Sequence, residues 1–579
     1  MRFGRFRPAS ADALVCIALA IVATWPLVLH IATHAPGAGR WNGREVFFET
    51  PTNLWNLWWF RFAIVDLHQS PFNGTYTFYP VGADLWLHTL APLPAAVGAI
   101  LQTFVGLVVT YNMLTLAALV TAGVAAAALG RRLGLTPGSA RVAGAIYAFA
   151  PAVFARVYAG HFELLWIAWL PLTLLLFLRT IDPAERGWVP SLALGLALAG
   201  AVYTSAYYAI YALEAMSVAA VAYWRQVIQR PALMRLAVAS LVTVVSAAPM
   251  LARVGGSESA MGSTEGRSQD FRDLSLDPIA FVVPSFMHPV LAERLDATNL
   301  ALSQPRGLPQ EACGYLGWSV IALAVLGAWP AARARGAAAG TASVFRRGLP
   351  IALATVFLVL SLGSELKILG RATGITMPAS VLQHIPIVSM ARAPGRHVYV
   401  GMLGVALLAG AGLLRLPRRS WQVALLAVLA FEYWPKVPLT DTTVPRVYRR
   451  LALAPKDIAV LDVPAGARDG LGGIGRTQSF EFIGQTVHQK PIIGGMASRL
   501  SEERWRAVKT APLIGALMGV QDANSIVPSE AIAYFRLHRI QAIVVHPSAP
   551  RRDRELIERV LPIASREKYQ DGTELWWVW

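Results

Sequence analysis

The feature that most constrains this chain is a series of apolar segments, each of roughly 17 to 20 residues. An unpaired backbone group in hydrocarbon costs several kcal/mol, which only a helix avoids, so segments of this length predict membrane-spanning helices. The predicted crossings are Ala13–Ile31, Ala91–Leu129, Ala143–Val157, Leu164–Leu178, Pro190–Ala206, Tyr208–Tyr223, Leu236–Ala252, Tyr315–Trp329, Leu349–Gly363, Val398–Leu414 and Trp421–Trp434. The expected fold is therefore mainly α, a polytopic transmembrane bundle of about eleven helices.

The composition agrees with a chain that lies mostly in lipid. Hydrophobic residues make up 55% of the sequence and charged residues 15%, against about 25% charged in soluble domains. A net charge of +17 would suggest nucleic-acid binding in a soluble protein. Here the arginines cluster between apolar segments, as the positive-inside bias produces, so we expect no nucleic-acid partner. Cys16 and Cys313 have neither a disulfide framework nor metal-ligand spacing.

The basic clusters predict the orientation of the bundle. Eleven crossings place these clusters on one face, which the bias makes cytoplasmic: Arg131/Arg132/Arg141, Arg179/Arg186, Arg225/Arg230/Arg235, Arg333/Arg335/Arg346/Arg347 and Arg415/Arg418/Arg419. Arg2, Arg5 and Arg7 precede the first segment, which we interpret as a retained helix with its amino terminus inside rather than a secretory signal. The arginine-rich inner loops favour a bacterial plasma membrane.

One segment leaves the count open. Ala91–Leu129 is long enough for two crossings, and Gly106 offers a break between them. Two crossings there would invert everything downstream and place each arginine cluster outside. We therefore predict a single net crossing, with a juxtamembrane helix beside it.

This topology divides the chain into a transmembrane part, residues 1–435, and an extracytoplasmic carboxy-terminal domain, residues 436–579. The other outside segments are Thr33–Leu90, Gly255–Gly314 and Ser364–His397, and Gly336–Ser343 is predicted to be a cytoplasmic loop. Strand-like runs at Ile458–Val463 and Gln541–His546, with a helical stretch near Arg551–Val560, predict a small α/β fold for the carboxy-terminal domain.

The first outside loop combines tryptophans with carboxylates. Trp41, Trp55, Trp58 and Trp59 predict an aromatic stretch at the membrane interface, and the alternative is a belt that only anchors the helix at headgroup depth. Glu45 and Glu49 precede Asn53 in the same stretch. A carboxylate beside apolar surface has a raised pKa and is a plausible general base near neutral pH.

Several motifs resemble those of one enzyme group. An acidic residue, an asparagine four positions on, WNLWW and PF…FYPVGADLWLHTLAPL resemble the first loop of bacterial GT-C-type membrane glycosyltransferases. The resemblance continues in GHFELLWIAWLPL (160–172), the turn around Thr204–Tyr208, MPASVLQHIPIVSMARAPGRH (377–397) and QTVHQKPIIGGMASR (485–499), and so extends over nearly the whole chain. These motifs are moderately specific for the family and poorly specific for a substrate.

The resemblance implies a polyprenyl-phosphate-linked sugar donor and transfer to an extracytoplasmic acceptor, a glycolipid, polysaccharide or protein. It implies direct displacement at the anomeric carbon, with an acidic residue of the first loop as base. Glu49 occupies the matching position, where the family usually has aspartate, and Glu45 is the alternative.

His161 and Glu163 follow Gly160 at the predicted outer end of a helix. In one interpretation they are a polar helix end that reaches water. In the other, His161 helps to bind the donor phosphate while Glu163 forms an acidic pair with Glu49. A histidine with carboxylates can also ligate a divalent ion, so Glu49, His161 and Glu163 are the candidate metal ligands.

Arg392 and Arg396 lie just before a spanning helix on the outside, where the positive-inside bias would not place them. Because a guanidinium binds phosphate in bidentate fashion, the sequence predicts that this pair clamps the donor phosphate. Headgroup anchoring is the alternative. We expect Arg371 and Lys367 in the same loop to be solvated charges.

Other polar residues give weaker indications. His88 is a second candidate for the acceptor or phosphate site, and Glu214, in mid-helix, is either functional or paired with a polar group. The carboxy-terminal domain offers His488, Lys490, Arg499 and His546 without a nucleophile elbow, a metal-ligand spacing or a phosphate loop. We expect that domain to recognise the acceptor, to cap the site or to be structural.

Three functions are compatible with these residues: a glycosyltransferase, a transporter or flippase for lipid-linked glycans, and a non-catalytic family member in envelope assembly. A transporter should carry several ionisable residues and broken helices near mid-membrane. This chain has Glu214 there and concentrates its polar aromatic residues in outside loops. The sequence therefore favours the enzyme, with Asn53, His88, His161, Arg392 and Arg396 binding substrate.

Overall fold

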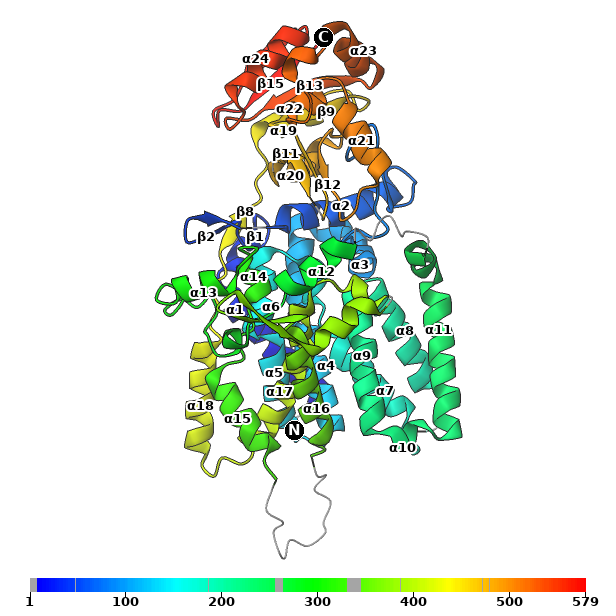
Figure 1. Cartoon of the computed structure of the whole chain (residues 1–579), viewed down its shortest axis with the longest axis vertical. Helices are drawn as coiled ribbons and strands as arrows, with labels where there is room; N and C mark the ends of the chain where they lie inside the picture. Colours follow the sequence, from blue (N-terminus) through cyan, green and yellow to red (C-terminus); the bar gives the residue numbers. More distant parts are fainter. Residues whose placement is uncertain are drawn as a thin grey trace, which may run out of the picture.

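A computed structural model describes residues 8–46, 48–185, 187–255, 264–330, 345–385, 387–470, 472–477 and 479–579. Some residues used above lie outside the described ones: Arg2, Arg5, Arg7, Arg186, Arg333, Arg335 and the predicted loop Gly336–Ser343. The described chain forms a helical bundle with the carboxy-terminal region stacked on one end of it (Figure 1).

The bundle is built around α17, whose residues are all buried. Glycines let its neighbours approach closely: a Cβ at Gly412 would overlap the Leu323 carbonyl, and one at Gly404 would crowd the Pro350 carbonyl. The main helices are α1 (Pro8–Ala23), α4 (Leu107–Arg132), α5 (Pro137–Ala148), α6 (Pro151–Ala159), α7 (Trp169–Thr180), α8 (Val189–Val202), α9 (Ala206–Ala222), α11 (Arg230–Gly255), α15 (Trp318–Ala328), α16 (Gly348–Ser361), α17 (Val398–Leu413) and α18 (Arg419–Glu432).

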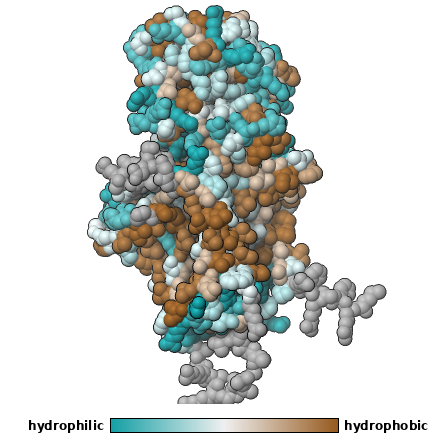
Figure 2. Space-filling model, turned by 90° about the vertical axis from the view of Figure 1, so that its right-hand side faces the viewer, coloured by the Kyte–Doolittle hydropathy of each residue, from teal (hydrophilic) through white to brown (hydrophobic). Residues whose placement is uncertain are grey.

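The bundle has the dimensions and surface of a membrane domain. Among the described residues, four helical stretches are long and apolar enough to cross a bilayer: 107–132, 137–159, 230–253 and 394–413. Several shorter apolar helices accompany them. A broad hydrophobic band covers the helical part, between a hydrophilic upper region and a hydrophilic lower end (Figure 2). The chain is therefore a membrane protein.

The long segment Ala91–Leu129 is divided at Gly106, where the sequence offered a break. Gly106 has φ +78° and separates α3 (Pro92–Val105) from α4. Gly98 of α3 packs against Thr110 and Leu114 of α4, so the two helices form a hairpin. Of the pair, only α4 meets both the length and the hydropathy needed to cross.

The arginine clusters meet at one end of the bundle. Asp12 of α1 is fully buried and pairs with Arg131 and with Arg141, whose Nε lies 3.1 Å from Asp12 Oδ1. Arg132 pairs with Asp182 at the end of α7. This is the lower end in Figure 1, where the amino terminus is marked, opposite the carboxy terminus.

The carboxy-terminal region contains a sheet with strand order β14–β15–β13–β9. Strand β13 runs parallel to β9 and antiparallel to β15. The bounds are β9 (Ala459–Val463), β13 (Ile540–Val545), β14 (Ser565–Lys568) and β15 (Glu574–Trp577), with α20 (Ser479–His488), α21 (Glu502–Thr510), α23 (Pro528–Leu537) and α24 (Arg551–Val560) alongside. The predicted strands and helix of this region coincide with β9, β13 and α24.

The first outside loop and the carboxy-terminal region fold together. Strand β1 (His34–Pro36) pairs with β8 (Leu439–Asp441), and α2 (Thr50–Val65) packs on α20. Trp55 Nε1 donates to Gln485 Oε1 at 2.6 Å. Trp55, Trp58 and Trp59 are 1%, 6% and 0% exposed, so they belong to a protein core and do not form a headgroup belt.

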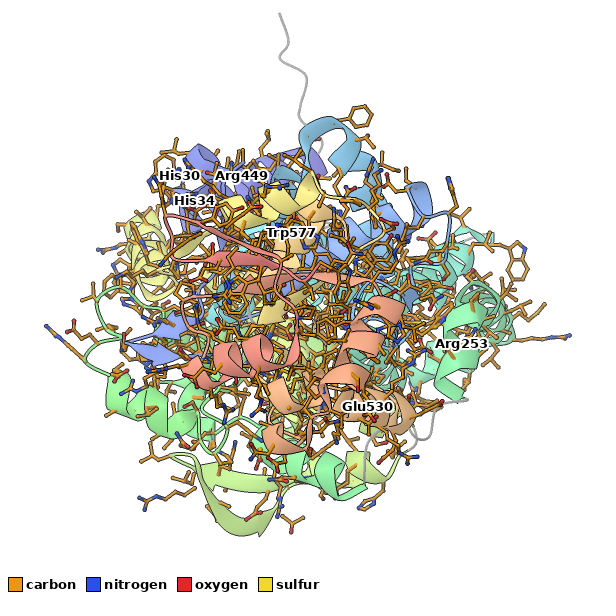
Figure 3. The ribbon with its side chains drawn as sticks, turned by 90° about the horizontal axis from the view of Figure 1, so that it is seen from above. His30, His34, Arg253, Arg449, Glu530 and Trp577 are labelled. Carbon is orange, nitrogen blue, oxygen red and sulfur yellow. The ribbon has the colours of Figure 1, made fainter. Side chains whose placement is uncertain are left out.

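The loop also covers the width of the bundle. Seen from above, the His30/His34 pair and Arg253 lie on opposite sides of the molecule (Figure 3). His34 belongs to β1 at one end of the loop, whereas Arg253 of α11 lies over the ring of Trp86 near its other end, 5.3 Å from the centroid. The first loop therefore reaches from one side of the outer end of the bundle to the other.

Candidate active site

The start of α2 and the end of α6 meet at Gly160. Gly160 has φ +72°, and a Cβ there would overlap the backbone nitrogen and the hydroxyl of Thr50. The Glu49 amide, just before α2, donates to the Ala159 carbonyl at 2.8 Å. This close approach brings Glu49 Oε2 to 3.7 Å from His161 Nε2. Glycine is required at position 160 because no side chain fits between the two chain segments.

Glu49 and Glu163 form a buried pair of carboxyl groups. Burial raises the pKa of Glu49 to about 8, and the neighbouring Glu163 carboxylate raises it in the same direction. Burial likewise raises the pKa of Glu163 to about 7. Glu163 Oε2 has no hydrogen-bond partner among the described residues. The predicted acidic pair is thus assembled from two outer segments, each group poised to exchange a proton near neutral pH.

His161 is held neutral beside this pair. Arg156 Nη1 donates to His161 Nδ1 at 3.3 Å, so Nδ1 carries no proton and Nε2–H faces Glu49. Burial, with the positive charge of Arg156, lowers the pKa of His161 to about 3. Its charge is therefore fixed across the physiological range.

A buried ion cluster that the sequence analysis did not predict supports the site. Glu311, on the short helix α14 (Pro309–Ala312), accepts from Arg156 at 2.5 and 2.9 Å. It also accepts from Arg396 at 2.7 and 3.3 Å. Arg156 Nε donates to Tyr399 at 2.6 Å. Arg156 interrupts an apolar segment, and an ionisable residue in such a place indicates a functional or paired group, so the sequence did contain a signal for it. Nothing in the sequence around Glu311 gave such a signal.

The two arginines of the predicted phosphate clamp have different partners. Arg396 binds Glu311 and lies 4.6 Å from the centroid of the Tyr207 ring. Arg392 Nη1 donates to the Gly470 carbonyl at 3.0 Å and lies 3.3 Å from Asp270.

Arg392 is accompanied by an arginine of the carboxy-terminal region. A Cβ at Gly470 would lie 2.7 Å from Arg499 Nη1 and 3.4 Å from Arg392 Nη2, so both guanidinium groups border this glycine. Burial and the charge of Arg392 lower the pKa of Arg499. We call Arg392 and Arg499 the arginine pair; the carboxylates of Asp270 and Asp469 offset part of their positive charge, and a bound anion would offset more of it.

Asn53 and His88 belong to a buried hydrogen-bond network. Asn53 Nδ2 donates to the Gly160 carbonyl at 2.8 Å, and His88 Nε2 lies 2.9 Å from Asn56 Oδ1. Glu45 lies elsewhere, on the exposed hairpin of β2 (Arg40–Trp41) and β3 (Arg44–Glu45), opposite Arg40. Of the two first-loop carboxylates, Glu49 is the one placed beside Glu163.

The remaining candidates are placed as follows. Glu214 pairs with His397, with 3.0 Å between Oε2 and Nε2. Lys367 is 5% exposed and donates to the Asp273 carbonyl. The prediction that Lys367 is a solvated charge was wrong, because the chain folds over this side chain. Arg371 is exposed.

In the carboxy-terminal region, Tyr448, Asp462 and His546 form a buried cluster with a 2.9 Å contact between Asp462 Oδ1 and His546 Nε2. His488 stacks on the ring of Tyr448, and Lys490 is buried beside His488. These groups bind one another.

Glu49, His161 and Glu163 are the predicted metal ligands. Among the described residues, no group of three or more histidine, cysteine, aspartate or glutamate side chains is placed to hold a metal ion. Metal binding by Glu49, His161 and Glu163 stays a prediction, and the proposed transfer uses no metal ion.

The fold identifies the class of the protein. A cryo-EM structure of the mycobacterial arabinofuranosyltransferase AftD superposes with a TM-score of 0.56 at 15% identity, covering 98% of this chain. The chain spans 41% of the length of that protein. Two further similar structures are an oligosaccharyltransferase from Archaeoglobus fulgidus (TM-score 0.43, 11% identity, 93% of this chain and 69% of that one) and ArnT from Cupriavidus metallidurans (0.40, 12%, 99% and 98%). The chain has the fold of the GT-C-type membrane glycosyltransferases, as its sequence motifs predicted.

A sequence-family model assigns the chain more specifically than its fold does. A family model described as a domain of unknown function, DUF6311, matches residues 57–432. The chain belongs to this family. No curated protein matches the chain.

Proposed function

We propose that this protein is a membrane glycosyltransferase that moves a sugar from a polyprenyl-phosphate-linked donor to an acceptor outside the membrane. The observation that carries the proposal is the buried Glu49/Glu163 pair at the outer end of a GT-C-type bundle. The arginine pair lies where the loop before α17 meets the carboxy-terminal region. A proton acceptor and an anion site are the two parts that sugar transfer from a phosphate requires.

The transfer is a direct displacement. The acceptor hydroxyl donates its proton to the Glu49 carboxylate while its oxygen bonds to the anomeric carbon of the donor. The bond between that carbon and the phosphate oxygen breaks, and the phosphate leaves with the electron pair. Glu163 Oε2, without a partner among the described residues, accepts a hydrogen bond that orients the acceptor.

The leaving phosphate is stabilised by the arginine pair. Arg392 and Arg499 approach each other beside Gly470, and a phosphate between them relieves the repulsion that lowers the pKa of Arg499. Arg396 makes two bonds to Glu311 and its side chain is 13% exposed, whereas Arg392 is 26% exposed and makes one contact of 3.3 Å with Asp270. We therefore assign Arg396 to the support of the carboxyl pair, not to direct phosphate binding.

The protein resides in a bacterial plasma membrane. Its arginine-rich end faces the cytoplasm and its carboxy-terminal region lies outside, because the arginines gather at the end of the bundle that carries the amino terminus. The donor phosphate and the acceptor then meet at the outer surface.

The test is transfer by purified protein in lipid nanodiscs supplied with a panel of polyprenyl-phosphate sugars. Glu49→Gln is expected to lower kcat by about 100- to 10,000-fold, the usual contribution of a general base. Glu45→Gln is the matched control, because this carboxylate lies on an exposed hairpin of the same loop. Loss of activity with Glu45→Gln but not with Glu49→Gln would reverse the assignment.

Two other outcomes would contradict the proposal. Donor movement between leaflets without release of polyprenyl phosphate would favour a flippase. If the wild-type protein consumed no donor of the panel while glycolipids changed on deletion of the gene, a non-catalytic role in envelope assembly would gain support.

A further inference from the structure

A file of buried polar side chains connects the carboxy-terminal region with the start of α2. Ser498 contacts His88 Nδ1 through its amide at 3.0 Å and its hydroxyl at 3.1 Å. His88 Nε2 lies 2.9 Å from Asn56 Oδ1, and Asn56 Nδ2 donates to Asn53 Oδ1 at 3.1 Å. His88, Asn56 and Asn53 are 7%, 2% and 1% exposed, so water does not compete for these bonds. We call these four residues the His88 file.

The protons of the file have one consistent arrangement. The Ser498 amide is a donor, so His88 Nδ1 accepts and carries no proton. The proton is therefore on Nε2, which donates to Asn56 Oδ1, and Asn56 donates to Asn53. Burial lowers the pKa of His88 to about 4, in agreement with a neutral ring. Both ring nitrogens are engaged, so His88 is not free to bind substrate.

One end of the file holds the carboxyl pair in place. Asn53 Nδ2 donates to the Gly160 carbonyl at 2.8 Å and to the Glu49 carbonyl at 3.3 Å. Gly160 directly precedes His161. The amide of Asn53 therefore joins the two chain segments that carry Glu49 and Glu163.

The other end adjoins the arginine pair. Arg499 Nη1 donates to the Ser498 carbonyl at 2.7 Å, and the Gly470 amide donates to the same oxygen at 3.1 Å. Arg392 donates to the Gly470 carbonyl. Any anion that draws the two guanidinium groups together acts on the backbone of Ser498, whose amide begins the file.

We infer that His88 is a positioning residue, which couples anion binding at the arginine pair to the placement of the Glu49 carboxyl group. The inference rests on the proposed function, and it gives His88 a role in transmitting position rather than in binding donor or acceptor. The bonds run in series from Ser498 through His88 and Asn56 to Asn53, and Asn56 also donates to the Thr89 carbonyl at 3.1 Å. A shift of Ser498 therefore passes through the file to Asn53. The carboxyl pair is then aligned when a phosphate occupies the arginine pair.

The first test compares two substitutions at position 88. His88→Leu removes both hydrogen bonds, whereas His88→Gln retains one acceptor and one donor on the side chain. His88→Leu is expected to lower kcat by about 10- to 100-fold, the effect of a misplacement of the order of 1 Å, with the KM for the donor unchanged. His88→Gln should restore most of kcat without changing its pH profile. The same substitutions at exposed His30 are the control (Figure 3).

A double-mutant cycle separates coupling from general damage. If His88 acts through Glu49, His88→Leu should have little further effect in a Glu49→Gln background. An equal loss in both backgrounds would overturn the inference, as would a rise in KM in place of the fall in kcat. Failure of His88→Gln to recover activity would also overturn it, because the imidazole would then be needed for its own chemistry.

Hydrogen–deuterium exchange provides a test that does not depend on transfer. Inorganic phosphate should slow amide exchange in residues 49–56 of the wild type and of His88→Gln, but not of His88→Leu. If the wild type proved inactive on each donor, the proposed function would fail. The exchange measurement would still test the coupling between the arginine pair and residues 49–56. Equal protection by phosphate in all three proteins would show that the file transmits nothing.

Discussion

Replacing Glu311 by glutamine removes the carboxylate that contacts both Arg156 and Arg396. The four donor–acceptor distances lie between 2.5 and 3.3 Å. The three side chains are 8%, 3% and 13% exposed, respectively. Removing one member of a buried ion pair leaves the other charged and poorly solvated, a penalty of about 3–5 kcal/mol. Glu311→Gln is expected to destabilise the protein by this amount.

The matched control is Glu185→Gln. Glu185 lies 2.7 Å from Arg179, but these side chains are 27% and 42% exposed, and such pairs contribute about 1 kcal/mol or less. For cooperative unfolding of 579 residues, an entropy near 2.1 cal/mol/K per residue converts 3–5 kcal/mol into a fall in Tm of roughly 2.5–4 °C. The control should lower Tm by less than about 1 °C, as measured by thermal unfolding in one detergent.

The same substitution has a second readout. The negative charge of Glu311 raises the pKa of both Glu49 and Glu163. Glu311→Gln should therefore lower both pKa values and move the acid limb of the pH–rate profile to lower pH. Equal changes in Tm for Glu311→Gln and Glu185→Gln, or an acid limb displaced to higher pH, would refute the assignment of Glu311 to this cluster.

Three further predictions follow from the site. Because Glu49 must be ionised to accept a proton and has a pKa of about 8, wild-type kcat/KM should rise with pH, with the midpoint of the rise near pH 8; a profile flat from pH 5 upward would contradict its role. Gly160→Ala should destabilise the protein by about 1–3 kcal/mol and lower kcat, because of its φ of +72° and its contact with Thr50, whereas Gly138→Ala, in open space, should do neither. Because the proposed displacement uses Glu49 as the base and the arginine pair as the phosphate site, transfer should persist in EDTA; loss that manganese or magnesium reverses would show that a metal ion takes part.

The parts of the fold that depend on local sequence were predicted best. The apolar segments match helices of the bundle, and Gly106 breaks the longest of them because its φ of +78° suits glycine. Strands β9 and β13 and helix α24 also follow from short-range patterns. Two features could not be predicted: how deeply each helix is buried in the bundle, and that the first loop packs into the core of the carboxy-terminal region. Both depend on contacts between segments far apart in the sequence, which hydrophobic periodicity does not encode.

The candidate site was predicted in its types of residue more than in its partners. Glu49 and Glu163 both flank the Gly160 contact, close enough for the charge of Glu163 to raise the pKa of Glu49, and their joint role in catalysis stays a prediction. Arg156 and Glu311 are 155 positions apart, and their pairing arises only when α14 packs on α6. The burial of Lys367 has the same origin, since a loop charge looks alike in sequence whether or not another segment covers it.

The shared core of α2 and the carboxy-terminal region has a consequence for biosynthesis. Trp55 and its partner Gln485 are separated by 430 residues, a stretch that a ribosome needs roughly 20–90 s to translate. In the proposed topology the first loop is by then across the membrane, with the tryptophan faces of α2 uncovered. A segment made later buries one exported earlier, so we expect the nascent first loop to need protection by extracytoplasmic chaperones.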